Sequence, residues 1–422
     1  MLAFGPAFGL PGAPKSVWYT GAMVRRLSAL GMLLSLAGAA AARAGDLSLI
    51  LPFHNATGNP TLDWIGESVA ETTRETLSSY HLPVVERGAE QTAAGELVVH
   101  PAVSLTKASI IQLGLQVAAA RVVYGRFEYL PGPEPGDLSR GVLRFAARGI
   151  DVDRLAPGGE WSEEGPMASL SQLQTRLAWR ILRDLHPGPA PHETEFFSSR
   201  PPIRLDALES YARGLLAVAP EEKHRLFSLA VNLEAEFSPP KFQLGLMYWE
   251  SDSYRAAAEW LERVNPRDAH YLEANFLLGL CRYHLGDYAG ALAAFEVVAR
   301  TVPGDFVYNN IGLAQYRLGT PAALESLRWA MERDPDDPDY RFNLGYLLWR
   351  GGRLEEAAEH LRLALKIDPR DVGVRRLLDR CEAGSAYQRG DLGSEGLERL
   401  KSEHERIRGW RNKDTARTPT GG

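Results

Sequence analysis

The feature that most restricts the fold is a repeated pattern in the second half of the chain. A Leu-Gly or Ile-Gly pair begins at Leu244, Leu278, Ile311 and Leu344, at intervals of 34, 33 and 33 residues. Each pair is followed by a small residue and, four positions later, by a large one. These residues are Ala257 and Leu261, Ala291 and Phe295, Ala323 and Leu327, and Ala357 and Leu361. The period predicts stacked helical hairpins, in which the small residues let two helices cross closely and the large ones fill the space between neighbouring units.

Prolines close the units at Pro303, Pro335 and Pro369, and Pro266 is displaced in the earliest of the four. With these prolines, the pattern resembles the tetratricopeptide repeat, a helix-turn-helix unit of about 34 residues. A degenerate unit precedes the four clear ones, and a helix from Val372 to Cys381 is expected to cover the last apolar face. We therefore expect an all-α solenoid of about five repeats with a capping helix over residues 204–382.

The first half of the chain alternates strand-like and helix-like segments. Strands are expected at 47–53, 82–86, 96–103, 122–130 and 141–152, helices at 62–80, 109–120 and 170–185, and a turn at Ala156-Pro157-Gly158-Gly159. This order predicts a layered α/β domain over residues 45–187, so the whole chain is expected to be multidomain. A Pro-rich linker is expected over residues 188–203.

Four stretches of the α/β region resemble the TolB amino-terminal-domain-like group, which is related in fold to curli-secretion and flagellar outer-membrane lipoproteins. They are Leu51–Asn55, Gly58–Pro60, Leu62–Ala70 and Ala119–Arg126. The group often precedes tetratricopeptide repeats in bacterial proteins, and the resemblance implies no catalytic role. Asp63, Trp64 and Glu67 form a tempting site, but we expect Trp64 in the core and both carboxylates at the helix start.

The amino terminus carries an export pattern. Arg25 and Arg26 precede an apolar run, and Ala42-Arg43-Ala44 fits a cleavage site. We expect residues 1–44 to be a signal region with its true start at Met23 and cleavage near Ala44, which places the mature protein in the periplasm. The alternative is an uncleaved anchor, although the run from Leu27 to Ala42 is shorter than the about 20 residues of a membrane span. No cysteine follows the run, so a lipid anchor is not expected.

Charge and motifs argue against several other classes. The net charge of -6 does not provide the basic surface of a nucleic-acid binder. His192-Glu193-Thr194-Glu195 lacks the second histidine of a zinc-protease helix, so we expect no catalytic residue, metal or cofactor. A hydrolase or sugar-binding enzyme using the α/β domain remains the least favoured alternative. Cys281 and Cys381 lie about three repeats apart and are expected to be buried and unpaired.

The first helices of successive repeats predict a groove for a protein or peptide partner. The expected groove residues are Phe242, Leu246, Trp249, Phe276, Leu280, Tyr283, His284, Asn309, Leu313, Tyr316, Arg317, Phe342, Asn343, Tyr346, Trp349 and Arg350. Rigid aromatic rings provide much contact area, and Arg317 and Arg350 are suited to hold carboxylates. The alternative is that the same rings pack as core, so their exposure decides between the two interpretations.

Together these features predict a non-enzymatic scaffold of the bacterial cell envelope. The repeats would hold a peptide or protein segment, and the α/β domain would dock onto an envelope complex. The structural alternative is a self-assembly module. Residues 383–422 are expected to be a charged, partly disordered tail, in which Ser394 to Arg411 forms at most an amphipathic helix.

Overall fold

The computed structural model describes residues 47–87, 99–133, 137–186, 188, 191–388 and 396–407. All of them belong to the compact unit Ala44–Gly422. The predicted signal region lies outside the described residues. Among the described helices, none combines the length and apolar character that crossing a bilayer requires.

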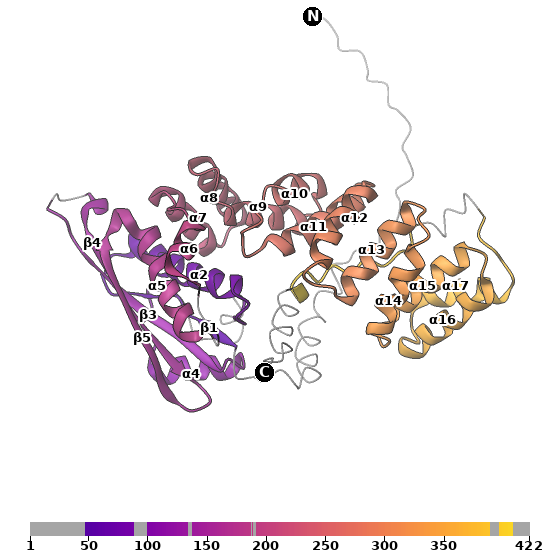
Figure 1. The fold of residues 1–422 in the computed structure, drawn as a ribbon, viewed down its shortest axis with the longest axis horizontal. Helices are drawn as coiled ribbons and strands as arrows, with labels where there is room; N and C mark the ends of the chain where they lie inside the picture. Colours follow the sequence, from indigo (N-terminus) through magenta and orange to yellow (C-terminus); the bar gives the residue numbers. More distant parts are fainter. Residues whose placement is uncertain are drawn as a thin grey trace, which may run out of the picture. The chain divides into compact units, whose positions relative to one another are not determined.

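A small mixed sheet forms the centre of the amino-terminal region (Figure 1). Its strands are β1 (Ser48–Ile50), β2 (His54–Asn55), β3 (Arg121–Leu130), β4 (Val142–Asp151) and β5 (Ala156–Pro166). The order is β1-β3-β4-β5, with β2 also on β3. The short strands β1 and β2 run parallel to β3, whereas β3, β4 and β5 form an antiparallel meander.

Two hydrophobic clusters bury the side chains of this sheet. One joins strand residues such as Phe127 and Phe145 to helices α2 (Asp63–Ser79) and α5 (Leu170–Leu185). The other joins Val122 and Ile150 to α4 (Lys107–Gln116). Because successive side chains of a strand point to opposite faces, neighbouring residues of β3 enter different clusters.

Of the three residues singled out at the start of α2, Trp64 lies where it was expected, and no described side chain caps this helix start by a hydrogen bond. Trp64 is buried in the core, and Asp63 lies in the first turn, where its carboxylate accepts a hydrogen bond of 2.7 Å from the Asn55 side chain. Glu67 was wrongly expected to stabilise the helix start. Its carboxylate is buried and forms a 2.9 Å ion pair with Arg87.

Several predicted strands and turns differ from the structure. The Gly-rich segment predicted as a turn at 156–159 begins strand β5, and the chain reverses at 152–155 instead, where Leu155 has a φ of 51°. Gly158 fits into this strand because it lies against Gly149 of β4, where a Cβ atom would be 3.0 Å from the Gly149 carbonyl carbon. Residues 82–86 contribute a single bridge, between Val84 and Ser48. Of the strand predicted at 96–103, residues 99–103 are irregular and the rest lies outside the described residues.

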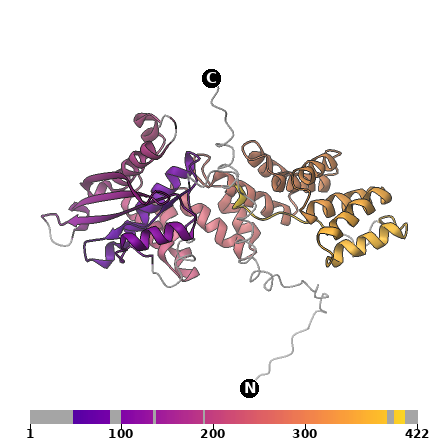
Figure 2. The same cartoon turned by 90° about the horizontal axis from the view of Figure 1, so that it is seen from below.

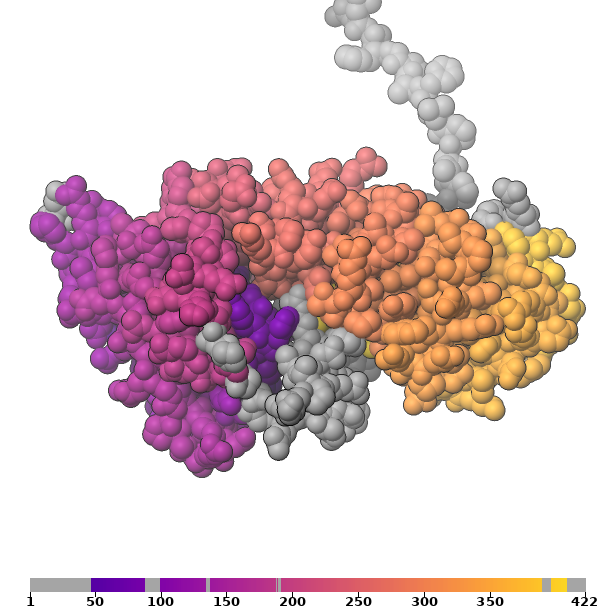
Figure 3. Space-filling view, viewed as in Figure 1, coloured from indigo at the N-terminus to yellow at the C-terminus, as the bar shows by residue number. Residues whose placement is uncertain are grey.

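Successive helical hairpins follow (Figures 1 and 2). In the described residues they are α7 (Leu205–Leu216) with α8 (Pro220–Leu233), α9 (Pro239–Glu250) with α10 (Tyr254–Leu261), α11 (Tyr271–His284) with α12 (Tyr288–Ala299), α13 (Asp305–Arg317) with α14 (Ala323–Arg333), and α15 (Pro338–Arg350) with α16 (Leu354–Ile367). Helix α17 (Val372–Glu382) packs on α16, and the short α6 (Glu193–Ser198) precedes α7. The surfaces of successive hairpins are in close contact (Figure 3).

The recurring glycine and large residue meet within one unit. A Cβ atom at Gly279 would lie 2.5 Å from the Phe295 ring, and one at Gly345 would lie 3.0 Å from Leu361. The large residues were predicted to fill the space between units. In addition, each large residue fills the hollow that the glycine leaves in the first helix of its own hairpin. This contact explains why the two positions recur together.

Both cysteines agree with their prediction. Cys281 and Cys381 are free and buried, in α11 and α17. Burial raises the pKa of the Cys281 thiol to about 12 and that of Cys381 to about 11. Thiols that stay protonated react slowly, so these residues act as small apolar side chains.

Carboxylates gather where α2 meets the start of α11. Burial raises the pKa of Asp268 to about 6. Burial and the neighbouring Glu71 and Asp268 also raise the pKa of Glu75 well above its usual range. Asp268 accepts a 2.8 Å hydrogen bond from the His270 backbone N–H, which an asparagine at this position can also accept.

The raised pKa of Asp268 predicts a pH-dependent stability. The protonated acid stabilises the fold below the ordinary pKa of 3.8, and this contribution is lost as the pH rises through about 6. We therefore expect the gain in the free energy of unfolding that Asp268→Asn gives over the wild type to be about 2 kcal/mol larger at pH 7.5 than at pH 4.5. The pKa of about 6 lies about 1.5 units above pH 4.5, and each unit corresponds to about 1.4 kcal/mol. Urea denaturation at the two pH values measures the change, and the exposed Asp336→Asn is the control. Parallel pH profiles for Asp268→Asn and the wild type would contradict it.

Candidate peptide-binding groove

Two asparagines at equivalent positions of successive repeats hold one backbone segment. Asn310 in α13 and Asn343 in α15 each lie two residues before the glycine of their repeat. The Asn343 side chain donates 2.8 Å to the Arg399 carbonyl and accepts 2.9 Å from the Arg399 N–H. The Asn310 side chain donates 2.8 Å to the Lys401 carbonyl and accepts 2.9 Å from the Lys401 N–H. The bound residues belong to segment 396–407, which we call the tail segment.

A third asparagine connects these contacts. Asn309 donates 3.0 Å to the Arg399 carbonyl and accepts 2.8 Å from the Asn343 side chain. All three asparagines are fully buried. Buried amides are costly to leave without hydrogen bonds, so the tail backbone adds partners to those that the asparagines provide for one another.

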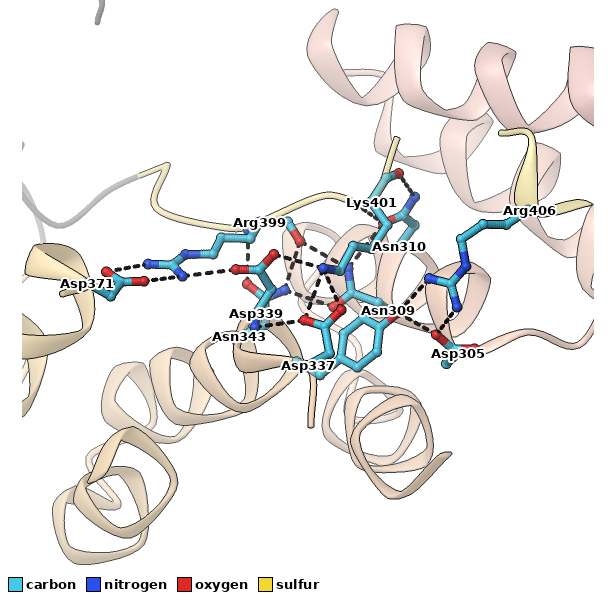
Figure 4. A network of polar contacts seen from close by, with 11 residues as sticks. Asp305, Asn309, Asn310, Asp337, Asp339, Asn343, Asp371, Arg399, Lys401 and Arg406 are labelled. Atoms are coloured by element: carbon cyan, nitrogen blue, oxygen red, sulfur yellow. Dashed lines mark hydrogen bonds and ion pairs between the residues drawn. The ribbon is translucent and has the colours of Figure 1, made fainter. Parts of the chain in front are cut away.

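The charged side chains of the tail segment meet carboxylates at the starts of the first helices (Figure 4). Arg399 forms two parallel contacts with Asp371, of 2.6 and 3.0 Å, and a 2.9 Å contact with Asp339. Lys401 lies 2.7 Å from Asp337 and 2.8 Å from Asp339. Two of these carboxylates, Asp337 and Asp371, are also the N-caps of α15 and α17.

The tail segment runs against the order of the repeats. Arg399 contacts α17 and α15, whereas Arg406, further along the chain, reaches Asp305 at the start of α13 at 2.6 Å. Tyr340 donates a 2.6 Å hydrogen bond to the same Asp305 carboxylate. The Ile407 side chain beyond it is fully buried.

The opposite charges of the tail segment and the groove shift the pKa values of the residues that meet there. Burial on its own would lower the pKa of Lys401, but Asp339 and Asp337 outweigh it and raise that pKa. Burial would raise the pKa of Asp339, but Lys401 and Arg399 outweigh it and lower that pKa. Both groups therefore stay charged at neutral pH, as tail docking requires.

The acidic residue of the tail segment pairs with a predicted groove residue. The Glu398 side chain is 2% exposed, and its carboxylate lies 2.8 Å from Arg317 Nε, while Arg317 Nη2 donates a 2.9 Å hydrogen bond to the second carboxylate oxygen. The hydroxyl of Tyr283 lies 3.4 Å from the same Nε atom. Leu397 and Leu400 pack against the repeat core on either side of this pair in sequence.

The structure divides the predicted groove residues into three groups. Asn309, Arg317, Phe342 and Asn343 contact the tail segment, since the Arg399 guanidinium lies 3.9 Å from the Phe342 ring centre. Trp349 and Arg350 contact residues 385–387, through a 2.8 Å hydrogen bond to Ser385 and a 3.5 Å stack on Tyr387. The third group consists of residues that lie in the repeat helices themselves. They are Phe242, Leu246, Trp249, Phe276, Leu280, Tyr283, His284, Leu313, Tyr316 and Tyr346.

Exposure therefore favours the core interpretation for most of the aromatic residues. Phe276, Leu280 and Tyr346 are fully buried, and Trp249 and Tyr316 are half-buried. His284 is exposed and stacks on Tyr254 at 4.4 Å. The contacts to the tail segment are polar groups at the same helix faces, rather than a contiguous ladder of exposed rings.

Sequence reasoning missed the tail segment and its ligands. The sequence predicts at most an amphipathic helix from Ser394 to Arg411, and the described residues 396–405 are not helical. Asn310 and the carboxylates Asp305, Asp337, Asp339 and Asp371 were not among the predicted residues. One signal was available, because Asn310 and Asn343 lie one repeat length apart and an asparagine inside a helix has no local reason to recur.

A second group of polar residues lies beside the end of the tail segment. Glu71, Glu75 and His270 offer oxygen and nitrogen atoms within 4.8 Å of one another. They line a cavity of about 280 Å³ together with Leu246, His404 and other residues. Glu71 is bonded to Arg74, and the His270 ring stacks on Phe242 at 4.4 Å. Glu71 and His270 therefore already contact other residues of the chain, and we assign no metal to this group.

Comparison with known proteins addresses the helical half. The sequence profile of the tetratricopeptide repeat matches residues 242–306 and 310–372. These residues form tetratricopeptide repeats. A search of curated proteins found no match to the sequence. The amino-terminal region lies outside the matched residues.

The solved structures that are similar over part of the chain include MamA and YrrB. MamA from Desulfovibrio magneticus RS-1 is 22% identical over 39% of this chain and 95% of its own, with a TM-score of 0.35. YrrB, described as a tetratricopeptide-repeat protein with an unusual peptide-binding site, is 21% identical over 37% of this chain and 82% of its own, with a TM-score of 0.32. Likeness at this level carries no functional conclusion.

Proposed function

We propose that this protein is a non-enzymatic scaffold whose repeats hold an extended peptide segment of a partner protein. The observation that carries the proposal is the backbone clamp formed by Asn310 and Asn343 around Arg399 and Lys401. A clamp on backbone groups accepts any extended chain in one register, and solenoid repeats expose concave surfaces suited to it. In this proposal the partner would take the place that the chain's own tail segment holds in the structure.

The location of this function is a separate part of the proposal. The export pattern before Ala44 and the resemblance of Leu51–Asn55 and Leu62–Ala70 to TolB-like domains support a periplasmic protein of the cell envelope. In that setting the sheet-containing region would dock the scaffold onto an envelope complex. A cleaved amino terminus at Gly45 in protein recovered from a periplasmic extract would support the location, and retention in the cytoplasm would contradict it.

Peptide binding is tested on the full chain with its tail weakened. In the variant Arg399→Ala/Lys401→Ala, the tail segment loses its contacts to Asp371, Asp339 and Asp337. We expect a fluorescent peptide with the sequence of residues 396–407 to bind this variant saturably. Adding Asn310→Ala and Asn343→Ala should weaken binding at least tenfold, because each lost hydrogen bond contributes about 1 kcal/mol.

The matched control is Asn275→Ala, which removes a side chain bonded to the Tyr271 carbonyl of its own helix. It should leave peptide affinity unchanged. Circular dichroism verifies that each variant keeps its helices. Absence of saturable binding, or equal binding by the asparagine variants, would contradict the proposal.

The self-assembly alternative has an observation of its own. A tail segment that reaches the groove of its own chain is also able to reach that of a second copy. Light scattering of the full chain distinguishes a dimer from a monomer. Tail exchange predicts a dimer, and Arg399→Ala/Lys401→Ala should make that dimer dissociate. A monomer at micromolar concentration favours the scaffold.

A further inference from the structure

We propose that the groove selects a partner segment by its charge pattern, namely an acidic residue, a basic residue directly after it, and a second basic residue two positions later. One aliphatic residue precedes the acidic residue and another lies between the two basic residues. This inference rests on the proposed function and adds the chemistry of the partner. The tail segment shows the pattern as Leu397-Glu398-Arg399-Leu400-Lys401. The partner it predicts is an extended, positively charged segment of another protein.

The backbone clamp gives this pattern a fixed register. Asn343 holds residue 399 and Asn310 holds residue 401 through both backbone groups. A bound segment displaced by one residue would break these hydrogen bonds or leave buried amides without partners. Each side chain of the partner therefore meets one defined site on the repeats.

The site for the acidic position is positive and enclosed. The 2% exposed Glu398 carboxylate lies 2.8 Å from Arg317, whose guanidinium also lies 5.5 Å from the Tyr288 ring centre. A basic residue here would place two like charges together in a site that water hardly reaches. Such a pair is strongly unfavourable, so this position should discriminate most.

The sites for the basic positions are negative and differ in shape. The Asp371 carboxylate makes two parallel contacts with the Arg399 guanidinium, which lies 3.9 Å from the Phe342 ring centre. The planar fork of arginine fits this arrangement, and lysine does not reproduce it. Lys401 places one ammonium between Asp337 and Asp339, where a compact point charge suffices.

The aliphatic positions complete the pattern. Leu397 and Leu400 pack against the buried cluster of the repeats. The residues that follow, Ser402 and Glu403, are exposed and should tolerate any polar side chain. Replacing the exposed Glu403 by arginine therefore changes the net charge of the segment as much as replacing Glu398, and serves as the control.

The test uses the full chain carrying Arg399→Ala/Lys401→Ala and labelled peptides of residues 396–407. We expect Glu398→Arg in the peptide to lower affinity at least thirtyfold, and Glu403→Arg, with the same net charge, to change it less than threefold. Arg399→Lys should lower affinity severalfold. Arg317→Glu in the protein should restore binding of the Glu398→Arg peptide at least tenfold.

The outcomes separate the inference from the proposed function. If all peptides bind alike, the charge pattern is wrong while peptide binding stands. If the native peptide does not bind, both fail. The peptide substitutions need no protein variant other than Arg399→Ala/Lys401→Ala, whose fold circular dichroism verifies, so they decide the matter even if Arg317→Glu does not fold. A wild-type dimer that exchanges tails would overturn the choice of another protein as partner.

Discussion

Phe295→Ala is expected to lower the free energy of unfolding by about 3–5 kcal/mol, which is the range for removing a large aromatic side chain from a core. Phe295 is fully buried and fills the hollow above Gly279. Its ring also meets Phe276 at a centroid distance of 5.7 Å. Because each repeat contacts only its neighbours, the loss should weaken the packing of the units on both sides.

Urea denaturation followed by circular dichroism measures this loss. Leu285→Ala provides the matched control, since Leu285 is 44% exposed at the end of the same hairpin's first helix. The control should change the free energy of unfolding by less than about 0.5 kcal/mol, as is usual for surface sites. Equal effects of the two substitutions would mean that the repeats are not packed as described.

Lys401→Asp is expected to release the tail segment from the groove. The substitution would place a third carboxylate beside Asp337 and Asp339, in a site where Lys401 is 7% exposed. Breaking a buried ion pair costs about 3–5 kcal/mol if the groups remain buried. The tail segment avoids this cost by leaving, so the loss should appear as undocking rather than as unfolding of the repeats.

Hydrogen exchange detects the release directly. In the wild type the Arg399 and Lys401 N–H groups are bonded to Asn343 and Asn310 and should exchange slowly. In Lys401→Asp both should exchange rapidly, while amides of α12 and α13 keep their protection. Lys366→Asp, at an exposed position of α16, is the control. Unchanged exchange of the tail segment would show that it does not depend on this charge.

Local patterns in the sequence predicted the repeats because each helical hairpin repeats the same packing problem. The recurrence of Gly279 with Phe295 and of Gly345 with Leu361 is set by contacts within one unit. The helix Leu170–Leu185 was predicted at its observed bounds for a similar reason, since an apolar stripe on a helix can be recognised locally.

The tail segment was not predictable in the same way. Leu397 and Leu400 have the three-residue spacing of a helix, and nothing nearby in the sequence opposes that interpretation. Its extended form depends on Asn310 and Asn343, which lie 91 and 56 residues away from their partners. Likewise, strand β5 was missed because the glycines in Ala156-Pro157-Gly158-Gly159 favour a turn locally, whereas pairing with β4 fixes them as extended.

Tethering sets a threshold for any competitor of the tail segment. Seven residues, 389–395, join it to Gln388 after α17, so it encounters the repeats at an effective concentration on the order of millimolar. A freely diffusing competitor at micromolar concentration must bind about a thousandfold more tightly than the tail segment to displace half of it. Weak binders would therefore not displace the tail segment. Only a protein with high intrinsic affinity, or one present at high local concentration, would bind in its place.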